Sequence, residues 1–200
     1  MTRFVALALL FAAACAQVPE GPEPIRLNFP EPRNFAAASP GPPQRPNSEI
    51  AMDFVDLAFR MESGRELPLF TRFEGPVTVR IAGAPPPSLT DDLTELLTRI
   101  RREARIDIDY AQGADANIVI EAVPSRALQR VAPNAACFVV PRVQSWTELR
   151  RARNTPTLDW ATLRRREKAA IFLPSDAAPQ EVRDCLHEEL AQALGPLNDL

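Results

Sequence analysis

Prolines divide this chain into two parts that cannot fold alike. Nine of its 21 prolines lie between positions 19 and 46, with alanine, serine and glycine filling many of the gaps. Proline fixes φ and removes a backbone donor, so such a stretch favours extended polyproline II and acts as a semi-rigid tether. We therefore expect a Pro-rich linker over residues 15–48 and one folded domain over residues 49–200, which is long enough for a single core.

The first 14 residues have the features of a signal peptide. Arg3 supplies a positive charge, and residues 4–14 form an apolar run that is too short to span a bilayer. Small residues directly precede Cys15, and this junction resembles the lipobox of bacterial lipoproteins. The resemblance implies cleavage before Cys15 and its acylation with chains such as palmitate, which would anchor the mature protein to a membrane. The alternative is ordinary secretory cleavage, which would leave Cys15 as a free thiol.

The residue after Cys15 bears on the location of the protein. It is Ala16 and not an aspartate, and in enterobacterial lipoprotein sorting this would not retain the protein at the inner membrane. We therefore expect a place in the bacterial cell envelope, on the periplasmic face of a membrane, with the outer membrane favoured. The lipid-anchored linker would hold the folded domain away from that membrane.

The remaining cysteines form an even pair. Of three cysteines, Cys137 and Cys185 are left once Cys15 carries lipid, and an exported chain meets an oxidising compartment. A disulfide between them would close a loop of roughly 48 residues and contribute about 4 kcal/mol in the chain-entropy model. It would fix the helix that carries Cys185 to the segment around Cys137. The alternative is two buried thiols.

Hydrophobic spacing predicts the secondary structure of the folded part. Apolar residues at helical intervals predict helices over residues 50–61, ending near Gly64, and over residues 89–104, opened by a capping-box pattern at Ser88. Alternating and β-branched residues predict strands over residues 77–81, 106–110, 117–122, 137–140 and 169–173.

A last helix should follow the final strand. We expect Ser175 or Asp176 to cap it, Pro179 to lie in its first turn, and Gly195 to end it as a left-handed residue. This order of strands and helices predicts an α/β (α+β) fold, in which a mixed sheet carries a backing helix and a C-terminal helix.

The end of the last helix resembles the zinc-binding helix of metzincin proteases, H-E-x-x-H-x-x-G-x-x-H followed by Asp. Glu188, Gln192 and Asn198 stand at the three histidine positions, whereas Glu189 matches the general base and Gly195 the turn. Zinc prefers imidazole and thiolate donors, so this set predicts no metal and no cofactor. Glu189 would then have no activated water to deprotonate, and we expect it to be a structural residue bonded to neighbouring backbone. The alternative is an ordinary helix ending.

The chain also resembles the family of proteobacterial putative lipoproteins known as the domain of unknown function 2927. The resemblance spans about residues 53–199 and is most specific over residues 70–77 and 185–195, with Asn198 and Asp199. It implies the fold and the envelope location, and no reaction is attached to it. Such chains normally continue beyond the Asn-Asp pair, so the resemblance implies either truncation after Leu200 or the absence of the lower half of a metzincin cleft.

A basic, tryptophan-containing stretch precedes the final strand. We expect a solvated surface here, with a weak contact to an anionic envelope polymer as the alternative. Nucleic acid is not an expected partner, because the net charge is −3 and the chain is exported. The residues are Trp146, Arg150, Arg151, Arg153, Trp160, Arg164, Arg165, Arg166 and Lys168.

These features predict a non-catalytic cell-envelope lipoprotein on a degenerate metzincin-like scaffold. Its partners would be a membrane, through the lipid anchor, and an envelope protein or peptide, or it would support assembly. The alternative is an atypical hydrolase or peptidase that uses Glu188 and Glu189, since paired carboxylates can act as acid and base. Adjacent helical residues point about 100° apart, which weakens that alternative.

Overall fold

The computed structural model of the chain describes residues 45–198. The predicted signal peptide, Cys15 and the linker up to residue 44 lie outside the described residues, as do Asp199 and Leu200. The helices are α1 (Asn47–Phe59), α2 (Leu89–Glu103), α3 (Ser125–Val131), α4 (Trp146–Ala152) and α5 (Pro179–Leu194), with two short 3-10 turns, Pro156–Leu158 and Trp160–Thr162. The strands are β1 (Val77–Gly83), β2 (Ile108–Tyr110), β3 (Ile118–Val123), β4 (Phe138–Pro141) and β5 (Ala169–Pro174).

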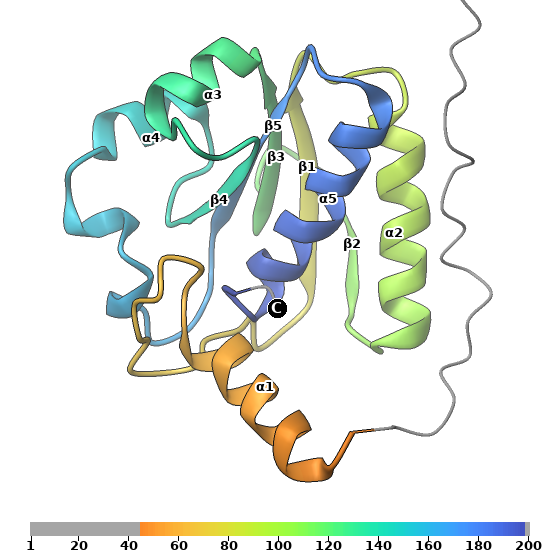
Figure 1. Cartoon of the computed structure of the whole chain (residues 1–200). Helices are drawn as coiled ribbons and strands as arrows, with labels where there is room; N and C mark the ends of the chain where they lie inside the picture. Colours follow the sequence, from red (N-terminus) through yellow and green to blue (C-terminus); the bar gives the residue numbers. More distant parts are fainter. Residues whose placement is uncertain (1–44, 199–200) are drawn as a thin grey trace, which may run out of the picture. The chain divides into compact units, whose positions relative to one another are not determined.

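The strands form one mixed sheet, as the sequence predicted. Its order is β2-β1-β3-β5-β4, and only the edge strand β4 runs antiparallel to its neighbour within this sheet. Every residue of β5 is buried, which accounts for its unbroken apolar sequence. The described domain is therefore an α/β fold in which α5, directly after β5, packs back on the sheet (Figure 1).

Helices cover both faces of the sheet. Ile171 and Leu173 of β5 face a core shared with α2 and α5. Phe172, on the opposite side of the same strand, faces a second cluster with Leu128 of α3 and Leu149 of α4. The two predicted helices, the backing helix α2 and the C-terminal helix α5, thus lie on one side, and α3 and α4 lie on the other (Figure 1).

The segment after α1 reaches the end of α5. α1 stops at Phe59, two residues before the predicted end, and Gly64 turns the chain with φ of 78°. Met61 pairs with Leu197 in a parallel bridge, and the backbone N–H of Glu62 donates to the Leu197 carbonyl at 3.2 Å. This arrangement brings Glu62 beside α5, which its position in the sequence did not predict.

The helix caps differ from those predicted. The side chain of Ser88 makes no capping hydrogen bond, although α2 begins next to it. The N-cap of α5 is Ala178, whose N–H donates to the carboxylate of Glu181 at 3.2 Å, so the expectation of a cap at Ser175 or Asp176 was wrong. Asp176 instead accepts bonds from the N–H and hydroxyl of Ser125. Because of this long-range contact with Ser125, Asp176 does not cap α5.

Gly195 ends α5 for a different reason from the one predicted. Its φ is −170°, an extended conformation that any residue adopts, and not the left-handed one. A Cβ atom at this position would lie 3.1 Å from the ring of Phe70. The requirement for glycine is therefore the close approach of an aromatic side chain.

The sequence missed α3 and α4, because each has seven residues and shows too little hydrophobic periodicity to be recognised. Between residues 45 and 198, no helix combines the length and the apolar content needed to cross a bilayer.

Candidate functional site

Glu188, Glu189 and Gln192 of the degenerate motif lie on α5, whereas Gly195 is its C-cap and Asn198 follows it. Val182, Leu186, Leu190 and Ala193 form its fully buried face toward the sheet. Cys185 and Glu189 lie beside that face, one turn apart, and are also buried. The side of α5 that carries Cys185 and Glu189 lies next to β4, since α5 packs against both β5 and β4.

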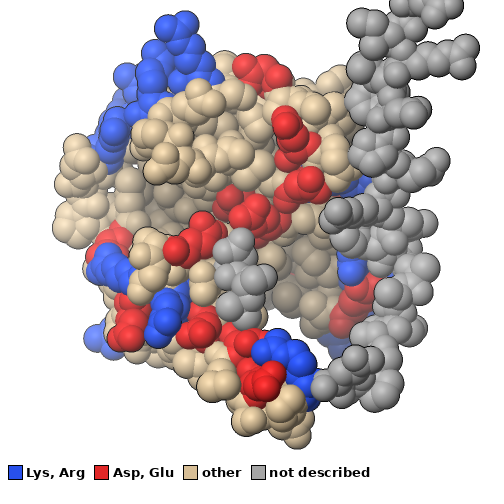
Figure 2. Space-filling model, viewed as in Figure 1, with Lys and Arg blue, Asp and Glu red and all other residues tan. Residues whose placement is uncertain are grey.

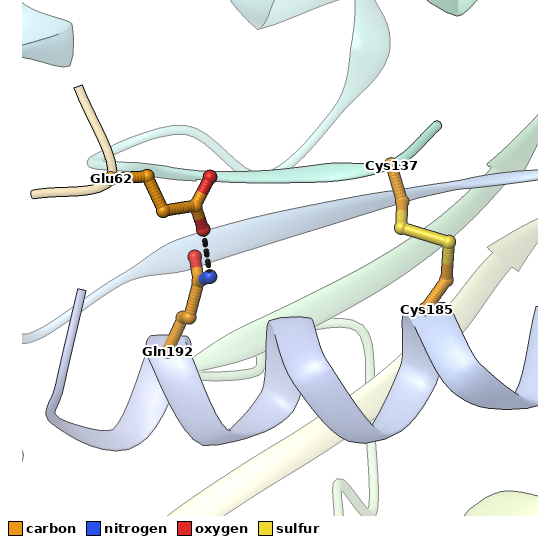
Figure 3. Close-up of a disulfide and its surroundings, with 4 residues drawn as sticks. All are labelled: Glu62, Cys137, Cys185 and Gln192. Atoms are coloured by element: carbon orange, nitrogen blue, oxygen red, sulfur yellow. Dashed lines mark hydrogen bonds between the residues drawn. A yellow bond between two sulfur atoms is a disulfide. The ribbon is translucent and has the colours of Figure 1, made fainter. Parts of the chain in front are cut away.

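A disulfide joins this side of α5 to the segment that leads into β4. Cys137 and Cys185 are bonded, with their Cα atoms 5.9 Å apart (Figure 3). The predicted pairing is confirmed, and it excludes the alternative of two buried thiols. The bond holds the start of the edge strand against the middle of α5.

The three positions that a metzincin fills with histidine have separate surroundings. Glu188 is exposed and lines a cleft. The side-chain amide of Gln192 is buried and donates to the carboxylate of Glu62 (Figure 3). Asn198 donates to the backbone carbonyl of Asp56 at 3.4 Å. Two of the three positions thus hold the segment around α1 in place.

Glu189, at the position of the general base, is buried with a relative exposure of 4%. Burial and, to a smaller extent, the charges of Glu188 and Glu62 raise its pKa to about 8, and the backbone N–H of Val139 acts in the opposite direction. Its Oε2 atom has no hydrogen-bond partner within residues 45–198. The expected backbone contact is therefore present, but half of this carboxyl group has no partner, and the group carries a proton at neutral pH.

A cleft of about 550 Å³ opens beside the disulfide. It is bordered by the segment after α1, by α3 and the loop before β4, and by α5. Acidic side chains dominate it, and no lysine or arginine is among its described lining residues. Figure 2 shows such acidic side chains across the middle of this face. The acidic members are Glu62, Glu181, Asp184, Glu188 and Glu189.

The cleft is a poor place for a zinc ion. The carboxylates of Glu188 and Glu189 and the sulfur of Cys137 lie within 4.8 Å of one another. That sulfur is part of a disulfide, so it cannot act as the thiolate that zinc prefers. His187 is half-buried, does not line the cleft, and has a lowered pKa, mainly through burial and then through the charges of Arg183 and Arg99.

Arg166 was wrongly placed on a solvated basic surface. It is 4% exposed, and its guanidinium donates to the carbonyl oxygens of Gln192, Ala193 and Gly195 at the end of α5. It also lies 4.6 Å from the ring centre of Trp160, which is buried as well. Burial lowers the pKa of Arg166 to about 9. This side chain caps the helix that carries the cleft.

Glu62 and Arg166 are the residues that sequence reasoning missed. Neither lies in a recognisable motif, and each reaches α5 from a distant part of the chain. The one available signal for Arg166 was its position shortly before a fully apolar strand, which does not distinguish it from Arg164 or Arg165.

These features define an α/β domain with an acidic cleft fixed by a disulfide. Residues 47–200 match the family described as protein of unknown function (DUF2927), and the chain belongs to this family. The resemblance noted in the sequence is thereby confirmed. No curated protein and no solved structure matched the chain.

Proposed function

We propose that the protein is a non-catalytic lipoprotein of the bacterial cell envelope and that its acidic cleft binds a positively charged segment of an envelope protein or peptide. The observation that carries this proposal is the buried Glu189, whose Oε2 atom has no partner among the described residues and lies at the base of a cleft lined by four more carboxylates. The lipid anchor at Cys15 and the degenerate metzincin-like scaffold are part of the same proposal.

The charge of the cleft determines the class of ligand. Four acidic side chains around Glu189, with no basic residue among the described lining, attract cations. A lysine ammonium has three donors and no acceptor, so it satisfies carboxylate oxygens without leaving polar atoms unpaired. Glu188 lies exposed and Glu189 lies buried, so the two would contact a ligand at the entrance and at the base.

Binding of a cation should release a proton. Glu189 is protonated at neutral pH because its pKa is raised to about 8. A positive charge beside it favours the ionised form and lowers that pKa. The ligand would therefore bind more tightly as pH rises from about 6 to 8.

Calorimetric titration of the full chain with tetralysine tests the proposal. We expect binding that weakens with added salt, releases protons, and is lost in Glu189→Gln and Glu188→Gln. Glu74→Gln is the matched control, because Glu74 is exposed and does not line the cleft. Equal affinity in all four proteins, or no binding at low salt, would overturn the proposal.

The second candidate function is an atypical hydrolase or peptidase. One observation favours it: carboxylate oxygens of Glu188 and Glu189 lie within 4.8 Å of each other despite pointing from adjacent helical positions. Glu189, with its raised pKa, would supply a proton, and the exposed carboxylate of Glu188 would accept one. Mass spectrometry of a peptide library incubated with the protein, with Glu189→Gln as the inactive variant, tests this candidate. Cleavage that persists in the variant would exclude it.

A further inference from the structure

A second cleft, of opposite charge, lies between α3 and α4. It measures about 440 Å³ and contains Arg130 of α3, Arg150 of α4 and Arg153 directly after α4. Trp146 and Val131 supply its apolar lining. α3 separates the two clefts, since Ser125 and Gln129 line the acidic cleft and Ala127, Arg130 and Val131 line the basic one. Figure 2 shows Lys and Arg gathered in the region where Figure 1 places α3 and α4.

The framework of this basic cleft is fixed by packing. The ring of Trp146 lies 5.2 Å from the ring of the buried Phe172, edge to face, and 6.5 Å from that of Phe138. Its backbone N–H donates to the carboxylate of Glu121 in β3 at 2.7 Å. The hydroxyl of Ser145 caps α4 by accepting from the N–H of Glu148. The helix that carries Arg150 therefore starts from a position held by the core.

Among the described residues, the arginines of the basic cleft lack the acidic partners that other arginines have. Arg65, Arg165 and Arg183 each form ion pairs with aspartate or glutamate. Within residues 45–198, no such pair involves Arg130, Arg150 or Arg153, and all three are exposed. Basic residues do stabilise the last turn of a helix, and Arg130 and Arg150 occupy such turns. Stabilisation of helix ends does not explain why Arg130, Arg150 and Arg153 all line the same cleft.

We propose that the basic cleft binds phosphate groups of an anionic ligand. The planar guanidinium presents donors in a fork that matches phosphate oxygens in pairs. Three guanidiniums around one cavity can contact two or more phosphates, while Trp146 and Val131 contact an apolar or ring-shaped body between them. This site is separate from the acidic cleft and does not depend on the function proposed for it.

The chain provides a matched control cluster. A third cleft, of about 330 Å³, contains four exposed basic side chains, Arg142, Arg164, Arg165 and Lys168. There, however, Glu167 lies in the same cleft and pairs with Arg165 at 2.5 Å. If net charge alone governed phosphate binding, the basic cleft and this control cluster would bind phosphate equally well.

Calorimetry with pyrophosphate, using the full chain, tests the proposal. We expect binding at low salt that weakens as salt is added, because ion contacts at exposed sites are screened. The triple variant Arg130→Gln, Arg150→Gln, Arg153→Gln should weaken it by about tenfold or more, since each lost charge-assisted bond contributes strongly. Arg164→Gln, Arg165→Gln, Lys168→Gln removes the same number of charges and should change the affinity by less than about threefold. Circular dichroism confirms folding in each case.

A second arm distinguishes the sources of phosphate. Vesicles of phosphatidylglycerol and of phosphatidylcholine are compared for the same three proteins, so that any contribution from residues 1–44 is common to all. If the variant of Arg130, Arg150 and Arg153 loses binding to phosphatidylglycerol vesicles and the control variant does not, a lipid headgroup is supported as the source of phosphate. If that variant loses only pyrophosphate binding, a soluble ligand is supported. Equal losses in both triple variants, or no binding of either probe by the unaltered protein, would overturn the proposal. The single variant Arg150→Gln, which should weaken binding severalfold, repeats the test if the triple variant fails to fold.

Discussion

Two buried ionisable side chains, Arg166 and Glu189, differ in how they are satisfied. Arg166 has no acidic partner within residues 45–198, but three carbonyl oxygens at the end of α5 accept its hydrogen bonds, and the partial negative charge of the helix end favours its positive charge. Glu189 has one backbone contact and one oxygen without a partner among the described residues. The full hydrogen bonding of Arg166 is typical of a structural residue, whereas the Oε2 atom of Glu189 is left to bond to a ligand.

Replacement of Arg166 should be strongly destabilising. Arg166→Met would leave the carbonyls of Gln192, Ala193 and Gly195 buried without donors, and we expect a loss of about 3 kcal/mol or more in the free energy of unfolding. Arg166→Lys should rescue little, because an ammonium cannot span three carbonyls in a plane. Urea unfolding measures the effect. Arg165→Met, at an exposed position, is the control, and equal losses at the two positions would contradict the capping role.

Replacement of Glu189 should change how stability depends on pH. Its folded pKa of about 8 lies above its unfolded value, so the folded state binds the extra proton between about pH 4.5 and 8. Stability should therefore be highest below the unfolded pKa and fall as pH rises through about 8. Glu189→Gln stays neutral and removes this fall, so the variant should gain on the order of a few kcal/mol relative to the parent between pH 5 and 9. Urea unfolding across that range measures the difference, and a parallel pH profile would contradict the raised pKa.

At the scale of elements, α5 is held at three places along its length. The disulfide fixes its middle to the start of β4, Gln192 bonds to Glu62 near its end, and Arg166 caps its last carbonyls. These contacts come from segments far apart in the sequence. Together they place the acidic side of α5 along the cleft.

Loss of the disulfide should lower stability substantially. The bonded cysteines are 48 residues apart, and closing a loop of that length contributes about 4 kcal/mol in the chain-entropy model. We expect the double variant Cys137→Ser, Cys185→Ser to unfold at much lower urea concentration than the parent. Adding a reductant to the parent should lower its stability similarly and leave the variant unchanged. A variant as stable as the oxidised parent would contradict this account.

Gly195→Ala should be destabilising through contact with Phe70. The added Cβ would lie 3.1 Å from the ring, so the ring or the helix end must shift, at a cost of about 1 kcal/mol. Gly113→Ala is the matched control, because nothing lies within 4 Å of its Cβ position. Thermal unfolding of both variants measures the difference. If Phe70→Leu does not relieve the effect of Gly195→Ala, the close approach is not its cause.

At the scale of the whole molecule, the domain carries two clefts of opposite charge on the two sides of α3. If the proposals for both clefts hold, the acidic cleft would bind a cationic peptide and the basic cleft would bind phosphate groups. Opposite charges on separate surfaces also allow two partners to bind at once, since neither cleft shares a described lining residue with the other.

The proposed lipid anchor at Cys15 is open to a direct test. We expect the mature protein to begin at Cys15 and to carry acyl chains there, so that it partitions with membranes. Mass spectrometry of the N-terminal peptide from native membranes measures the modification. Cys15→Ser should release the protein from the membrane fraction without changing the stability of the folded domain. A soluble native chain with an unmodified N-terminus would contradict the lipoprotein proposal.

The sequence by itself determined the sheet, two of its covering helices and the disulfide. The apolar runs that became β3 and β5, and the periodic residues of α2 and α5, are local patterns that burial imposes on consecutive residues. The pairing of Cys137 with Cys185 followed from parity. The degenerate motif also identified the helix that carries the candidate site, because the motif can be recognised in one continuous stretch of sequence.

Tertiary structure alone decided which polar residues meet at that helix. Arg166 and its neighbour Arg165 are identical in type, yet one is buried beneath α5 and the other is paired with Glu167 on the surface. Glu62 joins the cleft because Met61, directly before it, pairs with Leu197 after the end of α5, and Gly195 is needed because of Phe70. Such contacts depend on the packing of segments that are distant in the sequence. Their hydrogen bonding and burial are determined only when the core has formed, so no local sequence pattern predicts them.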